Sequence, residues 1–216
     1  FQEQYEDYLS FIEKKFLNDS SNSNVPQITF LVYYESANFK NVQRILNSFL
    51  EQSYGNWNLV LIPKTNDVVD SSLLPQDERI SVLFNSENKL ILDKINSLKY
   101  DFLGILDSNV LLPSYSLEQF AKFLKKNPDS DIFYSDNDDI DEHGKRHNPF
   151  FKPDWSLITF RSFDYVSLLC IMKKTLVEKV FTNEIPTDFS FDLSVHCIEK
   201  SEKIYHIPLP LYSILD

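Results

Sequence analysis

The stretch from Tyr100 to Pro113, YDFLGILDSNVLLP, most constrains what this chain can fold into. Its apolar run over 102–106 ends abruptly in Asp107-Ser108-Asn109, which is typical of a buried strand that stops at a polar turn. In open α/β sheets, ligands bind outside the carboxyl ends of the strands, where such a polar group lies. The same residue types also suit an ordinary turn, so this stretch alone leaves a binding site and a simple strand end both open.

The first half of the chain alternates between short apolar runs and helical spacing. Strands are predicted at 28–34, 59–62, 80–84, 102–106 and 132–134, and helices around 42–50, 90–98 and 117–124. Short strands that are continuously apolar are typical of a mainly parallel sheet covered by helices on both faces. We therefore expect an α/β half of the nucleotide-binding type over about 26–135.

The second half, 136–216, has a different pattern. Its first part, 136–154, is polar and rich in acids, and we interpret the acidic run over 136–142 as a solvated loop. The aromatic residues Phe150, Phe151 and Trp155 can line a sugar-acceptor groove or pack beneath that loop. Further elements are predicted as a strand at 165–172, a helix at 174–181, a helix that begins within 188–192, and a strand at 204–207. The four histidines have no ligand or triad spacing, so we assign them structural roles.

Residues 1–24 are set apart from the rest. Apolar residues at helical spacing predict an amphipathic helix, and a polar linker follows it. This helix is an appendage packed on the main domain or the tail of a preceding segment. We therefore divide the chain into 1–24 and a main domain over 25–216.

Composition excludes several classes of function. With 21 basic and 32 acidic side chains, the net charge of −11 disfavours nucleic-acid binding. The three glycines are too far apart for a GxGxxG motif or a P-loop. Cys170 and Cys197 lie in apolar patterns and are predicted to be buried free thiols. No apolar run is long enough to span a membrane, and the sequence does not start with a basic and then apolar leader. We therefore expect a cytoplasmic protein, and we leave open that the sequence is a piece of a longer chain.

Several stretches carry a resemblance when they are taken in order. They are PQITFLV (26–32), SFLEQSY (48–54), NWNLVL (56–61), the strand that ends at Asp107, YSDNDDIDEHGKRHNPFFKPDWS (134–156) and KIYHIPLPLY (203–212). Together they resemble glycosyltransferase family 2, in its O-antigen and rhamnan-type branch, over about 26–212. The resemblance implies a GT-A-like fold and transfer of a sugar from a nucleotide-diphosphate donor to a glycan or other acceptor. It also implies a role in surface polysaccharide or glycoconjugate synthesis, peripheral at the inner membrane face, with 136–216 as the acceptor half and further domains as partners.

The resemblance also implies roles for residues on the donor side. Asp107 matches the first acid of the family's DxD motif, and Asn109 replaces the second. We expect this pair to hold Mg²⁺ or Mn²⁺, which would neutralise the diphosphate. Glu35 and Lys64 occupy family donor-binding positions after the first and second strands, and Lys64 can contact a phosphate in place of the metal.

The catalytic base is placed on the acceptor side. Ser190 falls on the usual base position, Asp192 matches the second acid of that turn, and Asp188 lies two residues before Ser190. Asp192 and Asp188 are therefore the candidates for taking the proton of the acceptor hydroxyl. Because several family site residues are replaced while scaffold residues stay close, the alternative function is a catalytically silent domain that binds a partner or glycan.

Overall fold

The computed structural model describes residues 1–17, 26–35, 39–64, 73–181 and 191–216. In chain order, the elements are α1 (Gln2–Leu17), β1 (Ile28–Tyr34), α2 (Phe39–Leu50), β2 (Trp57–Pro63), β3 (Ile80–Val82), α3 (Asn88–Ser97), β4 (Phe102–Asp107), β5 (Val110–Leu111), α4 (Ser116–Lys126), β6 (Ile132–Ile140), β7 (Arg146–Phe150), α5 (Leu157–Ser162), β8 (Cys170–Lys173), α6 (Lys174–Phe181), α7 (Phe191–Lys200) and β9 (Ile204–Leu215). Within the described residues, nine strands form one sheet in the order β3-β2-β1-β4-β8-β6-β9-β5, with β7 paired to β6.

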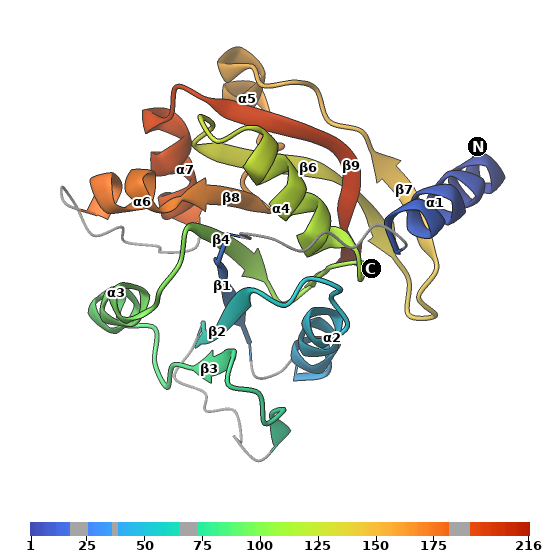
Figure 1. Ribbon diagram of the computed structural model, residues 1–216. Helices are drawn as coiled ribbons and strands as arrows, with labels where there is room; N and C mark the ends of the chain where they lie inside the picture. The colour runs from blue at the N-terminus through green and yellow to red at the C-terminus, as the bar shows by residue number, and fades with distance from the viewer. Residues whose placement is uncertain (18–25, 36–38, 65–72, 182–190) are drawn as a thin grey trace.

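The first half of the sheet is parallel, as predicted. β1 pairs in parallel with β2 and with β4, and β2 pairs in parallel with β3. Every residue of β1 is buried, and its side chains alternate between two cores: Phe30 packs with α2, whereas Leu31 packs with α3. Figure 1 shows α2 and α3 on opposite sides of β1 and β2. Cover on both faces explains why these strands read as continuous apolar runs.

The second half of the sheet is mixed. β8 lies between β4 and β6 and pairs antiparallel with both, whereas β9 pairs in parallel with β6. The short strands β5 and β7 add antiparallel pairs to β9 and β6. β4 and β6 therefore run in the same direction, and their carboxyl ends lie at the same edge of the sheet.

The interpretation of the acidic run as a solvated loop is wrong. β6 continues to Ile140 and forms a hairpin with β7, so most of the predicted loop is sheet. Asp136, Asn137 and Asp138 are buried. The carboxylates of Asp136 and Asp138 tolerate burial because other parts of the chain bring hydrogen-bond and charge partners to them.

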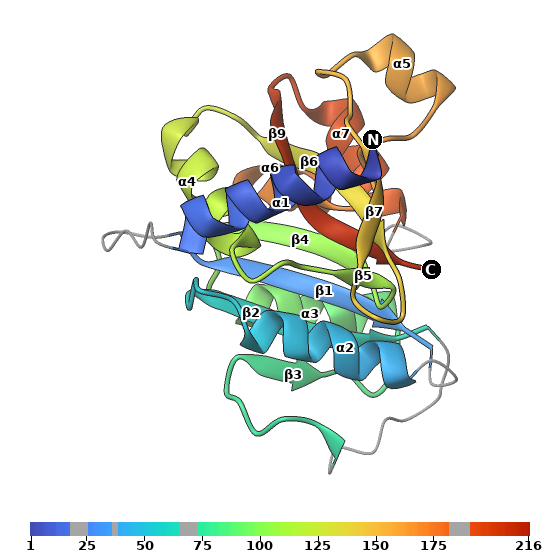
Figure 2. The same ribbon diagram turned by 90° about the vertical axis from the view of Figure 1, so that its right-hand side faces the viewer.

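Other elements also differ from the expectation. β9 runs on to Leu215, past Pro208 and Pro210, with a shift of its register against β6 beside the prolines. β8 begins only at Cys170, later than predicted. The helix α5 was not predicted, and none of its residues is buried. Figure 2 shows α5 standing out from the body of the domain.

The helix α1 packs on the main domain. Its residues Tyr5, Leu9, Ile12 and Phe16 belong to the core cluster that also contains the buried face of α2. Figure 2 shows α1 lying across the sheet. Both cysteines are free and buried, as predicted. No described helix has the length and apolarity needed to cross a membrane.

Candidate functional site

Three neighbouring strands end in charged residues at one edge of the sheet. Glu35 follows β1, Lys64 follows β2, and Asp107 is the last residue of β4. We call these three residues the edge cluster. The backbone holds the strand ends in register, because Lys64 N donates to Tyr34 O at 2.8 Å and Ser108 N donates to Tyr33 O at 2.9 Å. The structure therefore brings together the three residues that the sequence placed on the donor side.

The side chains of the edge cluster meet at the ammonium of Lys64. Its Nζ donates a hydrogen bond to Asp107 Oδ2 and lies 3.9 Å from Glu35 Oε1. The side chains of Lys64 and Asp107 are 35% and 36% exposed, and that of Glu35 is 53% exposed. Two carboxylates from adjacent strands thus face one cation, and all three groups remain open to solvent.

Asn109 does not face the edge in the same way. Its backbone oxygen accepts a hydrogen bond from Leu215 N at 2.8 Å. Its Oδ1 atom is buried without a hydrogen-bond partner among the described residues. Asp107 and Asn109 therefore do not turn two accessible oxygens toward a shared point. The described ranges also contain no cluster of three or more His, Cys, Asp or Glu residues that could hold a metal ion. The ligand set predicted for Mg²⁺ or Mn²⁺ does not fit this arrangement.

The predicted base lies mostly outside the described residues. Asp188 and Ser190 are not among them. Asp192 lies in the first turn of α7, and only its backbone is described. Their catalytic roles stay predictions.

A second acid, Asp136 of β6, lies near the same edge of the sheet. Ile171 of β8 pairs with Gly104 of β4 on one side and with Phe133 of β6 on the other. Asp107 lies three residues beyond Gly104, and Asp136 lies three residues beyond Phe133. At ordinary strand spacing, the two acids are separated across the sheet by about 10 Å. Asp136 therefore lies at the acceptor-half side of the edge cluster.

Asp136 is held by a histidine and by the aromatic segment that follows β7. His206 Nε2 lies 2.8 Å from Asp136 Oδ1, and His206 Nδ1 lies 3.1 Å from Asp154 Oδ1. Burial acts to lower the pKa of His206, but hydrogen bonds to the two carboxylates outweigh it and raise that pKa. The ring of Tyr134 stacks on His206 at 4.9 Å. The sequence placed this histidine in a structural role without identifying its partners.

Lys152 is a buried lysine of the same region. Its backbone N donates to Asp136 Oδ1 at 2.8 Å, and its Nζ donates to Tyr212 Oη at 2.6 Å. Burial lowers the pKa of Lys152 to about 7. The neighbouring Phe151 is 54% exposed, whereas Trp155 packs against Phe160. The aromatic segment therefore combines an exposed ring with a packed one.

Asp138 belongs to a closed network two residues further along β6. Its carboxylate accepts hydrogen bonds from Tyr5 Oη at 2.5 Å, Ser213 Oγ at 2.5 Å and Arg146 Nε at 2.7 Å. Arg146 also donates to Tyr115 Oη at 3.0 Å. The sequence signal that could have found this network is the alternation of Asp136 and Asp138, because residues two apart in a strand share one face.

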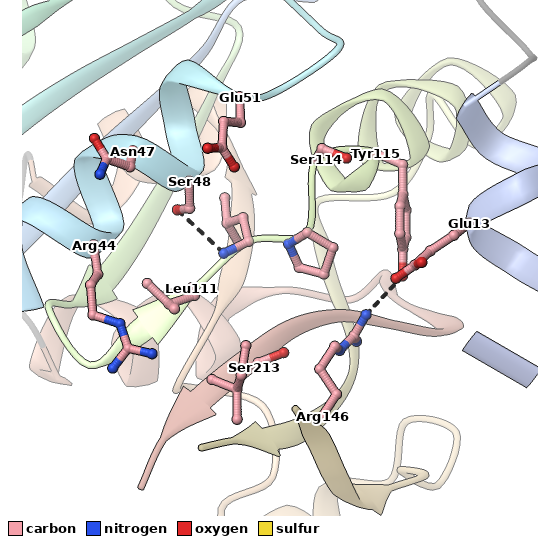
Figure 3. Close-up of a pocket in the computed structure, with 13 residues that line it drawn as sticks. Glu13, Arg44, Asn47, Ser48, Glu51, Leu111, Ser114, Tyr115, Arg146 and Ser213 are labelled. Atoms are coloured by element: carbon pink, nitrogen blue, oxygen red, sulfur yellow. Dashed lines mark hydrogen bonds between the residues drawn. The ribbon is translucent and has the colours of Figure 1, made fainter. Parts of the chain in front are cut away.

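The Arg146 network borders a cavity of about 350 Å³ between α2, α1 and the segment after β5. Figure 3 shows Arg146 and Tyr115 on one side of this cavity and Arg44 and Glu51 on the α2 side. No residue of the edge cluster lines it. The cavity is therefore separate from the candidate site.

Two curated proteins are similar to this chain in sequence and are much longer than it. No protein-family model matches the chain. The chain is 29% identical to the protein y4gI of Sinorhizobium fredii over 204 residues, covering 88% of this chain and 22% of y4gI. It is 26% identical over 201 residues to the O-antigen biosynthesis protein RfbC of Myxococcus xanthus, covering 88% of this chain and 16% of RfbC. The chain thus spans about a fifth of the length of these curated relatives.

Among solved structures, the chain is similar to TarS of S. aureus. The TM-score is 0.65 at 15% identity, with 88% of this chain covered, both for a TarS crystal structure and for residues 1–349 of TarS in complex with UDP-GlcNAc. The match covers 37% and 58% of those two chains, respectively. The predicted fold class, a GT-A-like α/β domain with helices on both faces of its sheet, is confirmed.

Proposed function

We propose that this domain is a glycosyltransferase of the family 2 type, which transfers a sugar from a nucleotide-diphosphate donor to a glycan or other acceptor. The observation that carries the proposal is the edge cluster, which gathers Glu35, Lys64 and Asp107 where the strands of such a fold present ligand-binding groups. TarS, which has a similar fold, has been crystallised with UDP-GlcNAc and with UDP. One relative is named for O-antigen biosynthesis, which supports a polysaccharide as the product.

The chemistry asks for two groups on opposite sides of the transferred sugar. Breaking the bond between sugar and diphosphate leaves negative charge on the diphosphate, which a cation must stabilise. The family resemblance assigns this role to Mg²⁺ or Mn²⁺. The other group is a base that takes the proton of the acceptor hydroxyl, and Asp192 or Asp188 is our candidate. A cytoplasmic location, further domains of a longer protein, and peripheral contact with the inner membrane face belong to the same proposal.

A catalytically silent domain is the second candidate. Two observations favour it: Asp107 is already paired with Lys64, and the Asn109 oxygen is covered. In such a domain the edge would bind a nucleotide or a glycan without transferring a sugar.

Calorimetry with UDP, GDP and dTDP tests the proposal first. We expect one of them to bind, and we expect Asp107→Ala to weaken that binding because the residue lies at the centre of the edge. Glu142→Ala is a matched control, since the side chain of this acid is 77% exposed and lies 3.6 Å from His143. If none of the three nucleotides or their sugars binds, the assignment of a donor site to the edge cluster is wrong.

The transfer step separates the two candidates. A chain that binds the nucleotide diphosphate and also releases it from a nucleotide sugar in the presence of a glycan acceptor is an enzyme. Release that disappears in Asp192→Asn or Asp188→Asn, with nucleotide binding retained, identifies the base. Binding without release across donors and acceptors supports the silent domain.

A further inference from the structure

Lys64 occupies the point on which two carboxylates converge. Glu35 and Asp107 belong to adjacent parallel strands, and Lys64 reaches them from the strand on the other side of β1. Its ammonium contacts Asp107 and lies 3.9 Å from Glu35 Oε1. Carboxylate oxygens that converge on one point are typical protein ligands of a divalent cation. The ammonium contacting Asp107 and a metal ion on the same oxygen cannot occupy that point together.

A lysine ammonium can also serve a diphosphate. It carries three N–H donors and no acceptor, so contacts with two carboxylates leave one donor for a phosphate oxygen. Lysine binds phosphate as a compact point charge without demanding a fixed geometry. The exposure of all three side chains leaves the ammonium within reach of a ligand.

We propose that the ammonium of Lys64 takes the place of the divalent cation, so that a nucleoside diphosphate binds at this edge without metal. The inference rests on the proposed function, since it concerns the donor of that reaction. It assigns the charge-neutralising role to Lys64, and leaves Asp107 the role of holding the ammonium in place.

The charge balance predicts how Glu35 behaves. The edge cluster carries one positive and two negative groups, a net charge of −1, which opposes a diphosphate. Glu35 is the more distant partner of Lys64 and the more exposed of the two acids. We therefore expect a diphosphate to displace Glu35, and not Asp107, from the Lys64 ammonium. If Lys64 is the cation, Glu35→Gln removes repulsion and tightens diphosphate binding. If a metal ion were used instead, the same change would remove a ligand and weaken binding.

Binding of Mn²⁺ alone tests the inference without any nucleotide. Titration followed by electron paramagnetic resonance should show that Lys64→Met binds Mn²⁺ at least about tenfold more tightly than the unmodified chain, because the two carboxylates are then free. Adding Asp107→Asn to Lys64→Met should abolish this gain. Lys89→Met, which changes an exposed lysine on α3, should leave Mn²⁺ binding unchanged. Equal binding by the unmodified chain and Lys64→Met overturns the proposal.

Binding of UDP then tests the role of the ammonium. The unmodified chain should bind UDP equally well in EDTA and in Mn²⁺. Lys64→Met should lose about tenfold or more in EDTA and recover when Mn²⁺ is added, since a charge-assisted contact is lost and then replaced. UDP binding that needs Mn²⁺ in the unmodified chain, or that Glu35→Gln weakens, contradicts the proposal. If no variant binds UDP in either buffer, the donor assignment fails, whereas the Mn²⁺ titration still decides whether Lys64 fills the cation position.

Discussion

The edge cluster and the inner acids, Asp136 and Asp138, contain the same residue type in opposite circumstances. Asp107 is more than a third exposed and its side chain has one cationic partner, whereas Asp138 is fully buried and accepts three side-chain hydrogen bonds. The inner acids cannot take up a ligand without abandoning a partner, and their network ties α1, β7 and β9 to β6. The edge acids can exchange partners at little cost. An acidic side chain near a sheet edge is thus a binding candidate only where its hydrogen-bonding capacity is left open.

The largest expected effect comes from breaking the inner network. Arg146→Met leaves Asp138 as an uncompensated buried charge, which should lower the free energy of unfolding by about 3–5 kcal/mol. Urea denaturation measures the loss. The matched control is Arg44→Met, which removes a partly buried hydrogen bond to Asp141 O and should cost less than about 1 kcal/mol. If both variants are equally stable, the inner network is not structural and the contrast with the edge cluster disappears.

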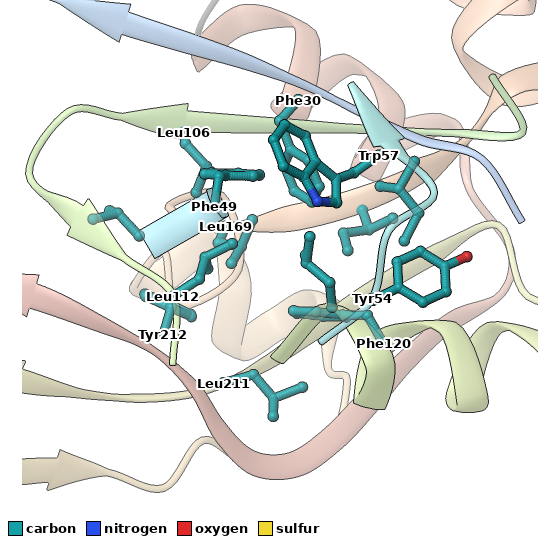
Figure 4. Packing of buried hydrophobic residues seen from close by; sticks show 14 of the residues in the cluster. Phe30, Phe49, Tyr54, Trp57, Leu106, Leu112, Phe120, Leu169, Leu211 and Tyr212 are labelled. Atoms are coloured by element: carbon teal, nitrogen blue, oxygen red, sulfur yellow. The ribbon is translucent and has the colours of Figure 1, made fainter. Parts of the chain in front are cut away.

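A smaller loss is expected from crowding the strand that carries Asp107. A Cβ atom at Gly104 would lie 2.5 Å and 2.6 Å from two ring atoms of Phe30. Figure 4 shows Phe30 packed among Phe49, Trp57 and Leu106, so the ring has little freedom to move. Gly104→Ala should therefore destabilise the domain by about 1–3 kcal/mol in urea denaturation.

Gly55→Ala is the control for that variant, because nothing lies within 4 Å of its added Cβ. It should leave the free energy of unfolding nearly unchanged. If Gly104→Ala is as stable as Gly55→Ala, the core beneath the edge cluster is looser than its packing indicates.

The pH dependence of stability should reveal the charged contacts of His206, which belong to the inner acid Asp136 and not to the edge cluster. Because the folded state raises the pKa of His206 above its ordinary value of 6.5, the stabilisation is complete below pH 6.5 and is lost as pH rises through the folded value. Lys152 has the opposite slope, since its pKa of about 7 makes the fold gain stability as pH rises toward 10.5. The difference between the unmodified chain and His206→Gln therefore isolates the histidine.

That difference is measured as the urea midpoint from pH 5 to pH 9. It should be largest in acid and shrink toward pH 9. His143→Gln serves as the control, since this histidine is 82% exposed. A difference that stays constant with pH would mean that the contacts of His206 do not depend on its charge.

The smallest effect on stability is expected at the edge cluster itself. Lys64→Met removes an exposed ion pair and should change the free energy of unfolding by only about 0.5 kcal/mol or less. Lys145→Met, which breaks the exposed pair with Glu6 at 2.9 Å, should change the free energy of unfolding by a similarly small amount. Only Lys64→Met should also alter the binding of UDP. A loss above about 2 kcal/mol for Lys64→Met would make the edge cluster structural, like the inner network.

Local patterns predicted much of the first half because its information is local. The bounds of β1 and of α6 agree with the apolar runs that predicted them, and Asp107 ends its strand as expected. The polar strand ends also indicated where the edge cluster would form. Parallel strands separated by helices bring their carboxyl ends together whatever the details of packing, so this part of the site follows from topology.

The acidic strand could not be predicted in the same way. Asp136 and Asp138 look solvated in the sequence because their cations come from distant positions: Arg146 from the next strand, and His206 from 70 residues along the chain. The prolines of β9 likewise suggested that this strand would end early. The strand continues because its register against β6 shifts beside the prolines. Whether a charge is buried depends on partners that only the folded chain brings together.

The sequence by itself determined the α/β class, the main strands and helices of the first half, and the stretch YDFLGILDSNVLLP as the place where a site would lie, because hydrophobic periodicity and strand ends are local properties. Only the tertiary structure decided which acids are exposed to solvent and which are buried with their hydrogen-bonding capacity filled. It placed the Lys64 ammonium against Asp107, turned the Asn109 oxygen inward and buried Asp138 beside Arg146. The physical reason is that the state of a charged group depends on its solvent and its neighbours in space, and residue spacing along the chain does not specify either.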